Sequence, residues 1–171
     1  MTPLRYEALS DRHDGAAFRC GEEVLDRYFQ AQASQDIHRR VANCFVAVES
    51  ATGRVAAYYT LSAASVALVN LPPELSKRLP RYPALPAARI GRLAVDLGFQ
   101  GMGLGAALVA NAARRTLQAD AAVFTLLVDS KNDRASAFYE KHGFRALVGQ
   151  PRTLFLALAT AQKALLTPAR R

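Results

Sequence analysis

Three glycines at alternate positions, Gly101, Gly103 and Gly105, stand where an apolar segment gives way to a predicted helix. Backbone N–H groups in the first turn of a helix have no partner inside the helix, and they lie at the positive end of its dipole. Phosphate groups bind at such a helix start. Glycine lets the backbone approach a ligand closely because it has no Cβ. The sequence therefore predicts that this loop binds a phosphorylated cofactor.

The spacing of the loop leaves its exact type open. Gly101, Gly103 and Ala106 satisfy the dinucleotide fingerprint, and Asp129 lies about where the ribose-binding acid of that motif would stand. However, the strand of that motif ends at its first glycine, whereas here the segment Asp96-Leu-Gly-Phe-Gln100 comes between the strand and Gly101. A P-loop is excluded, because no Gly-Lys-Ser/Thr follows the glycines.

Composition predicts one globular domain over residues 1–171. Of the 171 residues 51% are hydrophobic, which is ample for a core. The longest apolar runs fall well short of the ~20 residues that cross a membrane, and the first residues do not resemble a signal peptide. Cys20 and Cys44 form neither a metal spacing nor a disulfide framework. We therefore expect a cytoplasmic protein with no metal and no membrane association.

The charge distribution predicts a polyanionic partner. The net charge is +8, and between Glu74 and Asp96 there are basic residues but no acid. These are Lys77, Arg78, Arg81, Arg89 and Arg92. A basic stretch of this kind is typical of nucleic-acid binding or of contact with an acidic protein. The alternative is a solvated surface that only aids solubility.

Hydrophobic periodicity predicts the elements that position these residues. Strands are expected over 44–48, 54–64, 90–95, 121–128 and 153–159, and helices over 22–39, 73–79, 102–118 and 133–142. The first two strands are joined at 51–53 as a hairpin. Five prolines between 71 and 86 predict an irregular segment. The almost wholly apolar run 121–128 indicates a strand buried on both faces. The pattern predicts one mixed α/β domain.

Two segments resemble a known family. Gln100-Gly-Met-Gly103-Leu-Gly105, which follows the strand Gly91-Arg-Leu-Ala-Val-Asp96, is similar to the signature of GNAT acetyltransferases. The stretch from Asn132 through Phe138-Tyr139 to Gly143-Phe144 resembles the closing block of that family. Segments 18–21, 25–26, 58–62 and 80–86 further resemble the GNAT toxins of bacterial toxin–antitoxin pairs, so the likeness spans about residues 15 to 160.

The resemblance implies a fold, a reaction and partners. The fold would be α/β, a single-domain GNAT fold whose mixed central sheet is splayed between two parallel strands and flanked by helices. Acetyl-CoA would lie in that gap and donate its acetyl group. The acceptor would be the α-amine of aminoacyl-tRNA, so that acetylation blocks translation. A ribbon–helix–helix antitoxin would neutralise the protein, which would be either a monomer or a homodimer.

The resemblance also assigns roles to single residues. Tyr139 would be the general acid that protonates the departing CoA thiolate. The five basic residues from Lys77 to Arg92 would contact tRNA phosphates. The cofactor would be held by the backbone of β-strand residues Leu93, Ala94 and Val95, by the loop residues Gln100, Gly101, Met102, Gly103, Leu104, Gly105 and Ala106, and by Asn132 and Ser136.

Each of three residues has a plain structural alternative. Asn132 would serve only as a helix N-cap, Arg92 only as an ion-pair partner, and Tyr139 only in packing. No residue stands in a recognisable general-base motif. An α-amine, with a pKa of about 7.7–8.0, is substantially neutral without a base, whereas a lysine amine near ~10.4 is not. This favours aminoacyl-tRNA over a protein lysine.

Two other functions are compatible with the residues. One is a GNAT acetyltransferase of a small-molecule or protein amine. The other is a non-catalytic module that binds a cofactor or acts as a DNA-binding co-repressor. The complete glycine loop and Tyr139 count against a non-catalytic module, and no helix-turn-helix or zinc spacing supports a separate DNA reader.

Overall fold

The computed structural model describes residues 3–166, which form two compact units. The first unit comprises Met1–Ser62 and Ile90–Ala112, and the second Ala63–Arg89 and Ala113–Arg171. The chain passes from one unit to the other within β3 (Val55–Ala67), β4 (Ala84–Val95) and α4 (Leu104–Leu117). A single domain over residues 1–171 stays a prediction.

The described strands follow the order β1-β2-β3-β4-β5-β7-β6 in a mixed sheet. In the first unit, β1 (Leu4–Ala8) pairs antiparallel with β2 (Asn43–Glu49), and β2 pairs antiparallel with β3. The predicted hairpin is confirmed, and Gly53 at its turn has φ +74°. The sequence analysis missed β1, whose burial does not alternate cleanly along the strand.

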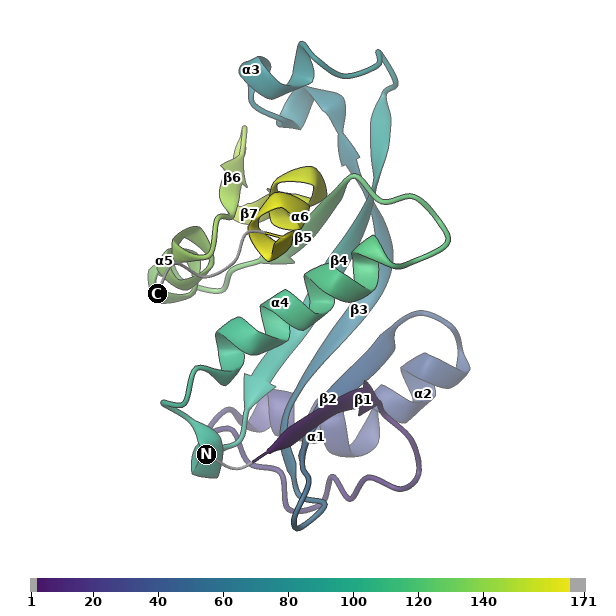
Figure 1. Cartoon of the computed structure of the whole chain (residues 1–171), viewed down its shortest axis with the longest axis vertical. Helices are drawn as coiled ribbons and strands as arrows, with labels where there is room; N and C mark the ends of the chain where they lie inside the picture. The colour runs from purple at the N-terminus through teal and green to yellow at the C-terminus, as the bar shows by residue number, and fades with distance from the viewer. Residues whose placement is uncertain (1–2, 167–171) are drawn as a thin grey trace. The chain divides into compact units, whose positions relative to one another are not determined.

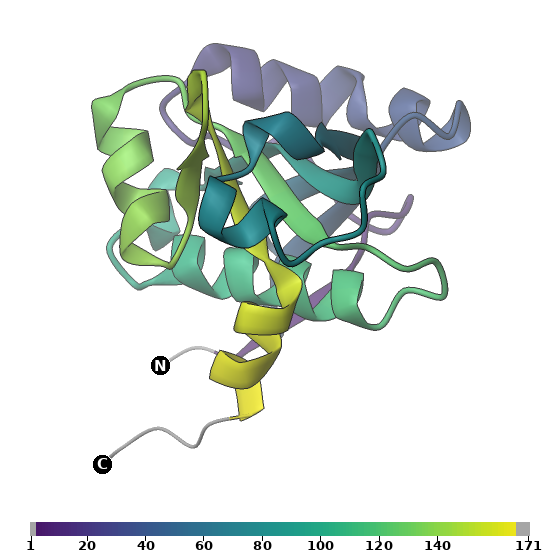
Figure 2. The ribbon, with the colours of Figure 1, turned by 90° about the horizontal axis from the view of Figure 1, so that it is seen from above.

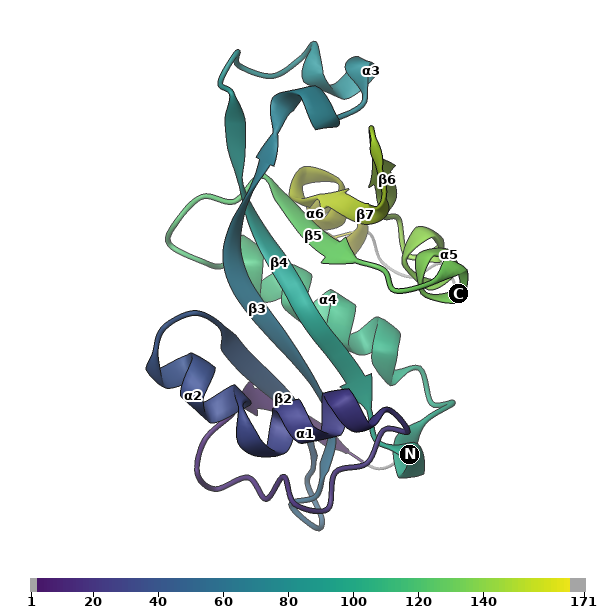
Figure 3. The same cartoon turned by 180° about the vertical axis from the view of Figure 1, so that it is seen from behind.

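Helices lie on both faces of the sheet in the first unit. In Figures 1 and 3, α1 (Glu23–Ala31) and α2 (Ala33–His38) lie on one face and the first part of α4 on the other. The single helix predicted over 22–39 was wrong in one respect, because the chain breaks at Gln32, with φ −116°. Ala33, directly after this break, is fully buried in the core.

An aromatic cluster forms the core of the first unit. The rings of Phe29 and Tyr58 stack with centroids 4.6 Å apart, and Phe18 packs against both. The Tyr58 hydroxyl donates a hydrogen bond to the carbonyl of Leu25 at 2.7 Å. Burial of the hydroxyls therefore costs little where each finds such an acceptor.

The second unit contains the C-terminal strands. β5 (Thr125–Asp129) pairs antiparallel with β7 (Gln150–Ala157), which pairs antiparallel with β6 (Arg145–Leu147). β5 is parallel to β4. The strand predicted over 121–128 was too long, since residues 121–124 are a loop. β6 and α6 (Leu158–Leu166) were not predicted; Figure 2 shows α6 continuing directly from β7.

The segment between β3 and β4 is irregular, as the prolines predicted. It contains a 3₁₀ helix, Leu68–Asn70, and the short helix α3 (Pro73–Ser76). β4 starts at Ala84, six residues before the predicted strand 90–95, and includes Pro86. Leu85 and Ala87 are buried whereas Pro86 is exposed, so the alternation of a strand persists through the proline.

The other helices agree closely with the sequence. α4 begins two residues later than predicted, and α5 (Asp133–Lys141) is capped by Asn132 and followed by Gly143 with φ +94°. None of the helices in the part of the chain that the structure describes is both long and apolar enough to cross a lipid bilayer.

The buried carboxylate of Asp96 fixes the end of β4. It accepts hydrogen bonds from the backbone N–H of Arg19 at 3.0 Å and of Gly98 at 2.8 Å. The guanidinium of Arg54 donates a third, at 2.8 Å. Because the Asp96 side chain is only 3% exposed, removing it would leave buried N–H groups without an acceptor.

We expect Asp96→Ala to lower the free energy of unfolding by ~2–4 kcal/mol, the usual range for losing a buried charged acceptor. Urea denaturation followed by circular dichroism measures this. Asp120→Ala, at an exposed aspartate, should change the free energy by no more than about 0.5 kcal/mol. Equal stability of the two variants would contradict the role given to Asp96.

Candidate active site

The glycine loop has the conformation that its sequence predicted. Gly101 and Gly103 have φ +80° and +78°, a region that other residues rarely adopt. A Cβ added at either glycine would meet no protein atom within 4 Å, so the space beside the loop is open. α4 begins at Leu104, and the N–H of Ala107 donates to the carbonyl of Gly103 at 3.2 Å. The N–H groups just before it therefore lie at a free helix start.

Gln100 connects this loop to two other segments of the first unit. Its Nε2 donates hydrogen bonds to the carbonyl of Cys20 at 2.9 Å and to that of Val95 at 3.0 Å. These are contacts expected of a residue that orients the loop. The Val95 carbonyl, predicted to contact the pantetheine arm, thus already accepts one hydrogen bond.

Leu93, Ala94 and Val95 form the last part of β4, immediately before Asp96. Just ahead of them, the N–H of Arg92 donates to the Thr60 hydroxyl at 3.0 Å rather than only to backbone. Thr60 was not singled out in the sequence, because no local pattern distinguishes it from other strand threonines. It lies 2% exposed.

These features fit a CoA-type cofactor. Two left-handed glycines, open space beside them and a helix N-terminus suit a pyrophosphate, which takes its hydrogen bonds from backbone N–H groups. Met102, next to these glycines, is exposed. The first-unit residues predicted for the cofactor, from Leu93 to Ala106, are therefore consecutive in one strand, loop and helix start.

In the second unit, Asn132 acts as the N-cap of α5. Its Oδ1 accepts a hydrogen bond from the N–H of Ala135 at 2.8 Å. This is the alternative role considered for it, and a contact to cofactor stays a prediction. Ser136, one turn into the helix, lies 2.5 Å from the hydroxyl of Ser130 and 3.4 Å from Arg152.

Tyr139 is buried on the inner face of α5. Its ring packs edge-on against Phe138 and Phe144, with centroid distances of 5.1 and 5.4 Å. Burial raises the pKa of Tyr139 to about 12. Proton transfer from such a phenol to a thiolate, whose acid has pKa ~8.5, is uphill by about 5 kcal/mol. A role as general acid therefore requires concerted transfer in a preorganised site.

The five predicted phosphate-binding cations differ in their surroundings. Lys77, Arg78 and Arg81 are exposed. Arg89 pairs with Asp129 at 2.5 Å. The guanidinium of Arg92 lies 3.6 Å from the centroid of the Tyr28 ring. The charges of Arg89 and Arg92 are thus engaged inside their own units.

The Tyr28 ring under Arg92 belongs to a hydrogen-bonded group. Its hydroxyl donates to Asp36 at 2.7 Å, and Gln32 donates to the same carboxylate at 3.1 Å. The bond from Tyr28 lowers the pKa of Asp36, and burial raises that of Tyr28. Arg92 was expected as an ion-pair partner, and its principal contact is instead with an aromatic face.

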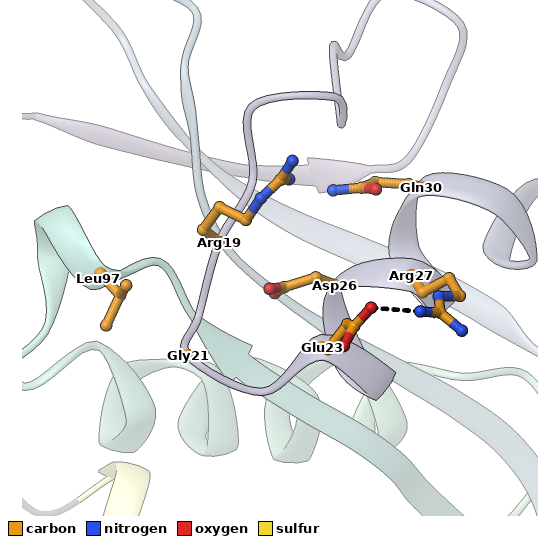
Figure 4. Close-up of a pocket in the computed structure, with 7 residues that line it drawn as sticks. All are labelled: Arg19, Gly21, Glu23, Asp26, Arg27, Gln30 and Leu97. Carbon is orange, nitrogen blue, oxygen red and sulfur yellow. Dashed lines mark hydrogen bonds and ion pairs between the residues drawn. The ribbon is translucent and has the colours of Figure 1, made fainter.

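An open pocket of about 520 Å³ in the first unit contains none of the predicted residues (Figure 4). Its lining is polar and charged, and includes Arg19, Asp26 and Gln30. Asp26 accepts a hydrogen bond from the N–H of Cys20 at 2.8 Å, and Arg19 donates to the carbonyl of Phe18 at 2.7 Å. Glu23 and Arg27 at its edge form an ion pair. The lining charges are therefore largely compensated within the pocket.

Residues 6–144 match the model of the acetyltransferase (GNAT) family, which is more than half of the chain. The chain belongs to the GNAT family. It is therefore an acetyl-CoA-dependent N-acetyltransferase with the α/β GNAT fold, in which β4 and β5 are the parallel pair.

Relatives of this GNAT acetyltransferase include toxins. A tRNA-acetylating toxin of Mycobacterium tuberculosis strain H37Rv is 33% identical over 156 residues, covering 90% of this chain and 92% of the toxin. AtaT complexed with acetyl-methionyl-tRNAfMet is 30% identical with TM-score 0.88, covering 96% and 100%. A tyrosine-to-phenylalanine mutant of the AtaT toxin, bound to the C-terminus of the antitoxin AtaR and to acetyl-CoA, is 25% identical with TM-score 0.77, covering 96% and 99%.

The glycine loop generates a first prediction for the site. Gly103→Val should weaken acetyl-CoA binding at least tenfold, because a branched side chain disfavours φ +78° and occupies the open space beside the loop. Isothermal titration calorimetry with acetyl-CoA measures the change. Gly53→Val is the matched control, since Gly53 has φ +74° and equally open surroundings in a hairpin turn.

Both glycine variants should lose some stability, and only Gly103→Val should lose cofactor affinity. If the two variants bind acetyl-CoA equally well, the loop does not hold the cofactor. NAD should not bind to the wild-type protein, and tight NAD binding without acetyl-CoA binding would point to a dinucleotide site instead.

Tyr139→Phe keeps the ring and its packing but removes the phenolic proton. We expect turnover to fall by about 10²–10⁴, the range for loss of a general acid, with acetyl-CoA affinity within a few-fold of wild type. Single-turnover acetyl transfer measures this. Tyr59→Phe is the control, because it removes another buried hydroxyl, one bonded to Asn111 at 2.7 Å.

The pH profile adds a second readout for Tyr139. Since burial raises its pKa to about 12, the phenol keeps its proton across the assay range. Between pH 7 and 10, kcat should therefore show no decline that is absent from Tyr139→Phe. Unchanged turnover in Tyr139→Phe would mean that the residue serves in packing alone.

Proposed function

We propose that this protein is a toxin that acetylates the α-amine of aminoacyl-tRNA and so blocks translation. The observation that carries the proposal is a likeness along nearly the whole chain to a tRNA-acetylating toxin and to AtaT in complex with acetyl-methionyl-tRNA. In the second of these the tRNA carries an acetylated amino acid. The same substrate class follows for this chain as a proposal.

Exposed cations support a tRNA substrate. Lys77, Arg78 and Arg81 lie within five residues of one another in the second unit, and all three are exposed. Exposed cations can replace the counterions of a phosphate backbone. Arg89 and Arg92 are part of the proposed surface too, but each would first have to leave its contact with Asp129 or Tyr28. We therefore assign most of the binding to the first three.

The chemistry of the acceptor amine also favours this substrate. Acetyl-CoA supplies an activated acetyl group as a thioester. An α-amine of pKa about 7.7–8.0 can attack it without a general base, and an ester-linked aminoacyl amine has a lower pKa still. In the proposed division of work, the β4 backbone at Leu93–Val95 and the loop Gln100–Ala106 hold the donor, assisted by Asn132 and Ser136. Tyr139 gives its proton to the departing thiolate.

We further propose that a ribbon–helix–helix antitoxin neutralises the protein. AtaT has an antitoxin, AtaR, whose C-terminus it binds. The net charge of +8 suits an acidic binding segment in such a partner. A short reading frame next to this gene that encodes a ribbon–helix–helix protein would agree with the proposal.

Expression of the chain alone should stop bacterial growth, and co-expression of the neighbouring antitoxin should restore it. The purified protein should transfer labelled acetyl to aminoacyl-tRNA but not to uncharged tRNA, because only the charged form carries the α-amine. A protein that is harmless alone and ignores charged tRNA, yet acetylates a small amine or a lysine peptide, would be an acetyltransferase of another substrate class.

The charge-reversal variants Arg78→Glu and Arg81→Glu sharpen this test. Each should raise KM for charged tRNA and reduce the slope of log affinity against log salt by about 0.7–0.9, since one phosphate contact is lost. KM for acetyl-CoA should stay unchanged. Arg114→Glu, at an exposed arginine of α4, is the control and should keep the wild-type salt slope.

A further inference from the structure

We propose that Tyr82 stacks on an unpaired base of the charged tRNA, next to phosphates held by Lys77, Arg78 and Arg81. This inference rests on the proposed function and adds a contact to a base where only phosphate contacts were assigned. The experiment below separates its failure from failure of the proposed function.

Tyr82 is unusual among the aromatic residues of this protein. Its exposed fraction is 62%, and every other tyrosine and phenylalanine, all of them within the described part of the chain, is buried or half-buried. A tyrosine on the surface leaves apolar area in water without contributing to a core. An exposed aromatic beside cations is the pairing that binds unpaired nucleotides, with the ring on a base and the cations on the backbone.

The charges around Tyr82 are of one sign. Glu74 is the one acid in the segment from 50 to 95, and it pairs with Arg145. That ion pair lowers the pKa of Glu74, so the carboxylate stays ionised and engaged. Lys77, Arg78 and Arg81 therefore present uncompensated positive charge on the same short segment as the exposed ring.

The segment that carries Tyr82 is held in place from within. Leu71 is buried in the second unit's core, and Leu75 and Leu79 pack against that core. The N–H of Leu68 donates to the carbonyl of Pro83 at 3.0 Å, which closes the segment at its base. The apolar side chains thus anchor the segment while its charged and aromatic side chains stay outside.

Two prolines restrict the backbone around the ring. Pro80 fixes its own φ one residue before Arg81, and Pro83 disfavours helical backbone at Tyr82. A preorganised segment loses little conformational entropy when it binds, so more of the stacking free energy appears as affinity. Stacking is also tolerant of sequence, because every base has a π-face.

The test compares Tyr82→Leu, which removes the ring, with Tyr82→Phe, which keeps it. Tyr82→Leu should raise KM for charged tRNA about tenfold or more, in the range of one lost base stack. Tyr82→Phe should stay within about threefold of wild type. Acetyl-CoA affinity, measured by calorimetry, should be unchanged in both and reports that each variant is folded.

The salt dependence separates stacking from charge. Tyr82→Leu should weaken tRNA use at every salt concentration with the wild-type slope, whereas Arg81→Glu should reduce the slope. A charged minihelix that contains only the acceptor stem and its single-stranded end locates the base. An equal defect with minihelix and whole tRNA places the base at the acceptor end, and a defect confined to whole tRNA places it in a loop.

Several results would overturn the inference. One is a wild-type KM for Tyr82→Leu with charged tRNA, and another is an equal loss in Tyr82→Phe, which would indicate a hydrogen bond of the hydroxyl. A change in oligomeric state with tRNA use intact would mean that Tyr82 contacts a protein. If instead the wild-type protein does not acetylate charged tRNA at all, the proposed function itself fails.

Discussion

The carboxylate of Asp96 is the interaction on which the first unit most depends. It joins the end of β4, the start of the next turn and the segment around Arg19 through three hydrogen bonds. All of these bonds stand at the point where the strand that carries Leu93–Val95 turns toward the glycine loop. Gln100 adds two more bonds across the same region. The loop can therefore keep strained glycine conformations because its entry is fixed from several sides.

The second unit solves a different problem, which is to present charge on a stable surface. The segment between β3 and β4 has little regular structure, yet Leu71 is 2% exposed and five prolines limit its freedom. Its cations consequently stand on a firm base rather than on a loose loop. Rigid presentation favours a partner that carries charge at fixed spacing, as the phosphates of a folded nucleic acid do.

The burial of Tyr139 has opposing consequences for catalysis. Packing against Phe138 and Phe144 holds the ring in one orientation, which favours proton donation to a defined atom. The same burial raises its pKa to about 12 and makes the phenol a weaker acid. A buried tyrosine is thus suited to giving its proton only while a thiolate is forming beside it. A substrate amine that needs no base is consistent with such a site.

The sequence by itself determined the features that depend on neighbouring residues. The glycine loop, the Asn132 cap, the hairpin at Gly53 and the family follow from residue types at fixed spacing, because turns and helix starts are set by local backbone energetics. Only the tertiary structure decided the rest. Asp129 with Arg89, Tyr28 with Arg92 and the high pKa of Tyr139 all arise between segments distant in the chain. Strands β1 and β6 likewise gain their stability from pairing with partners that local periodicity does not reveal.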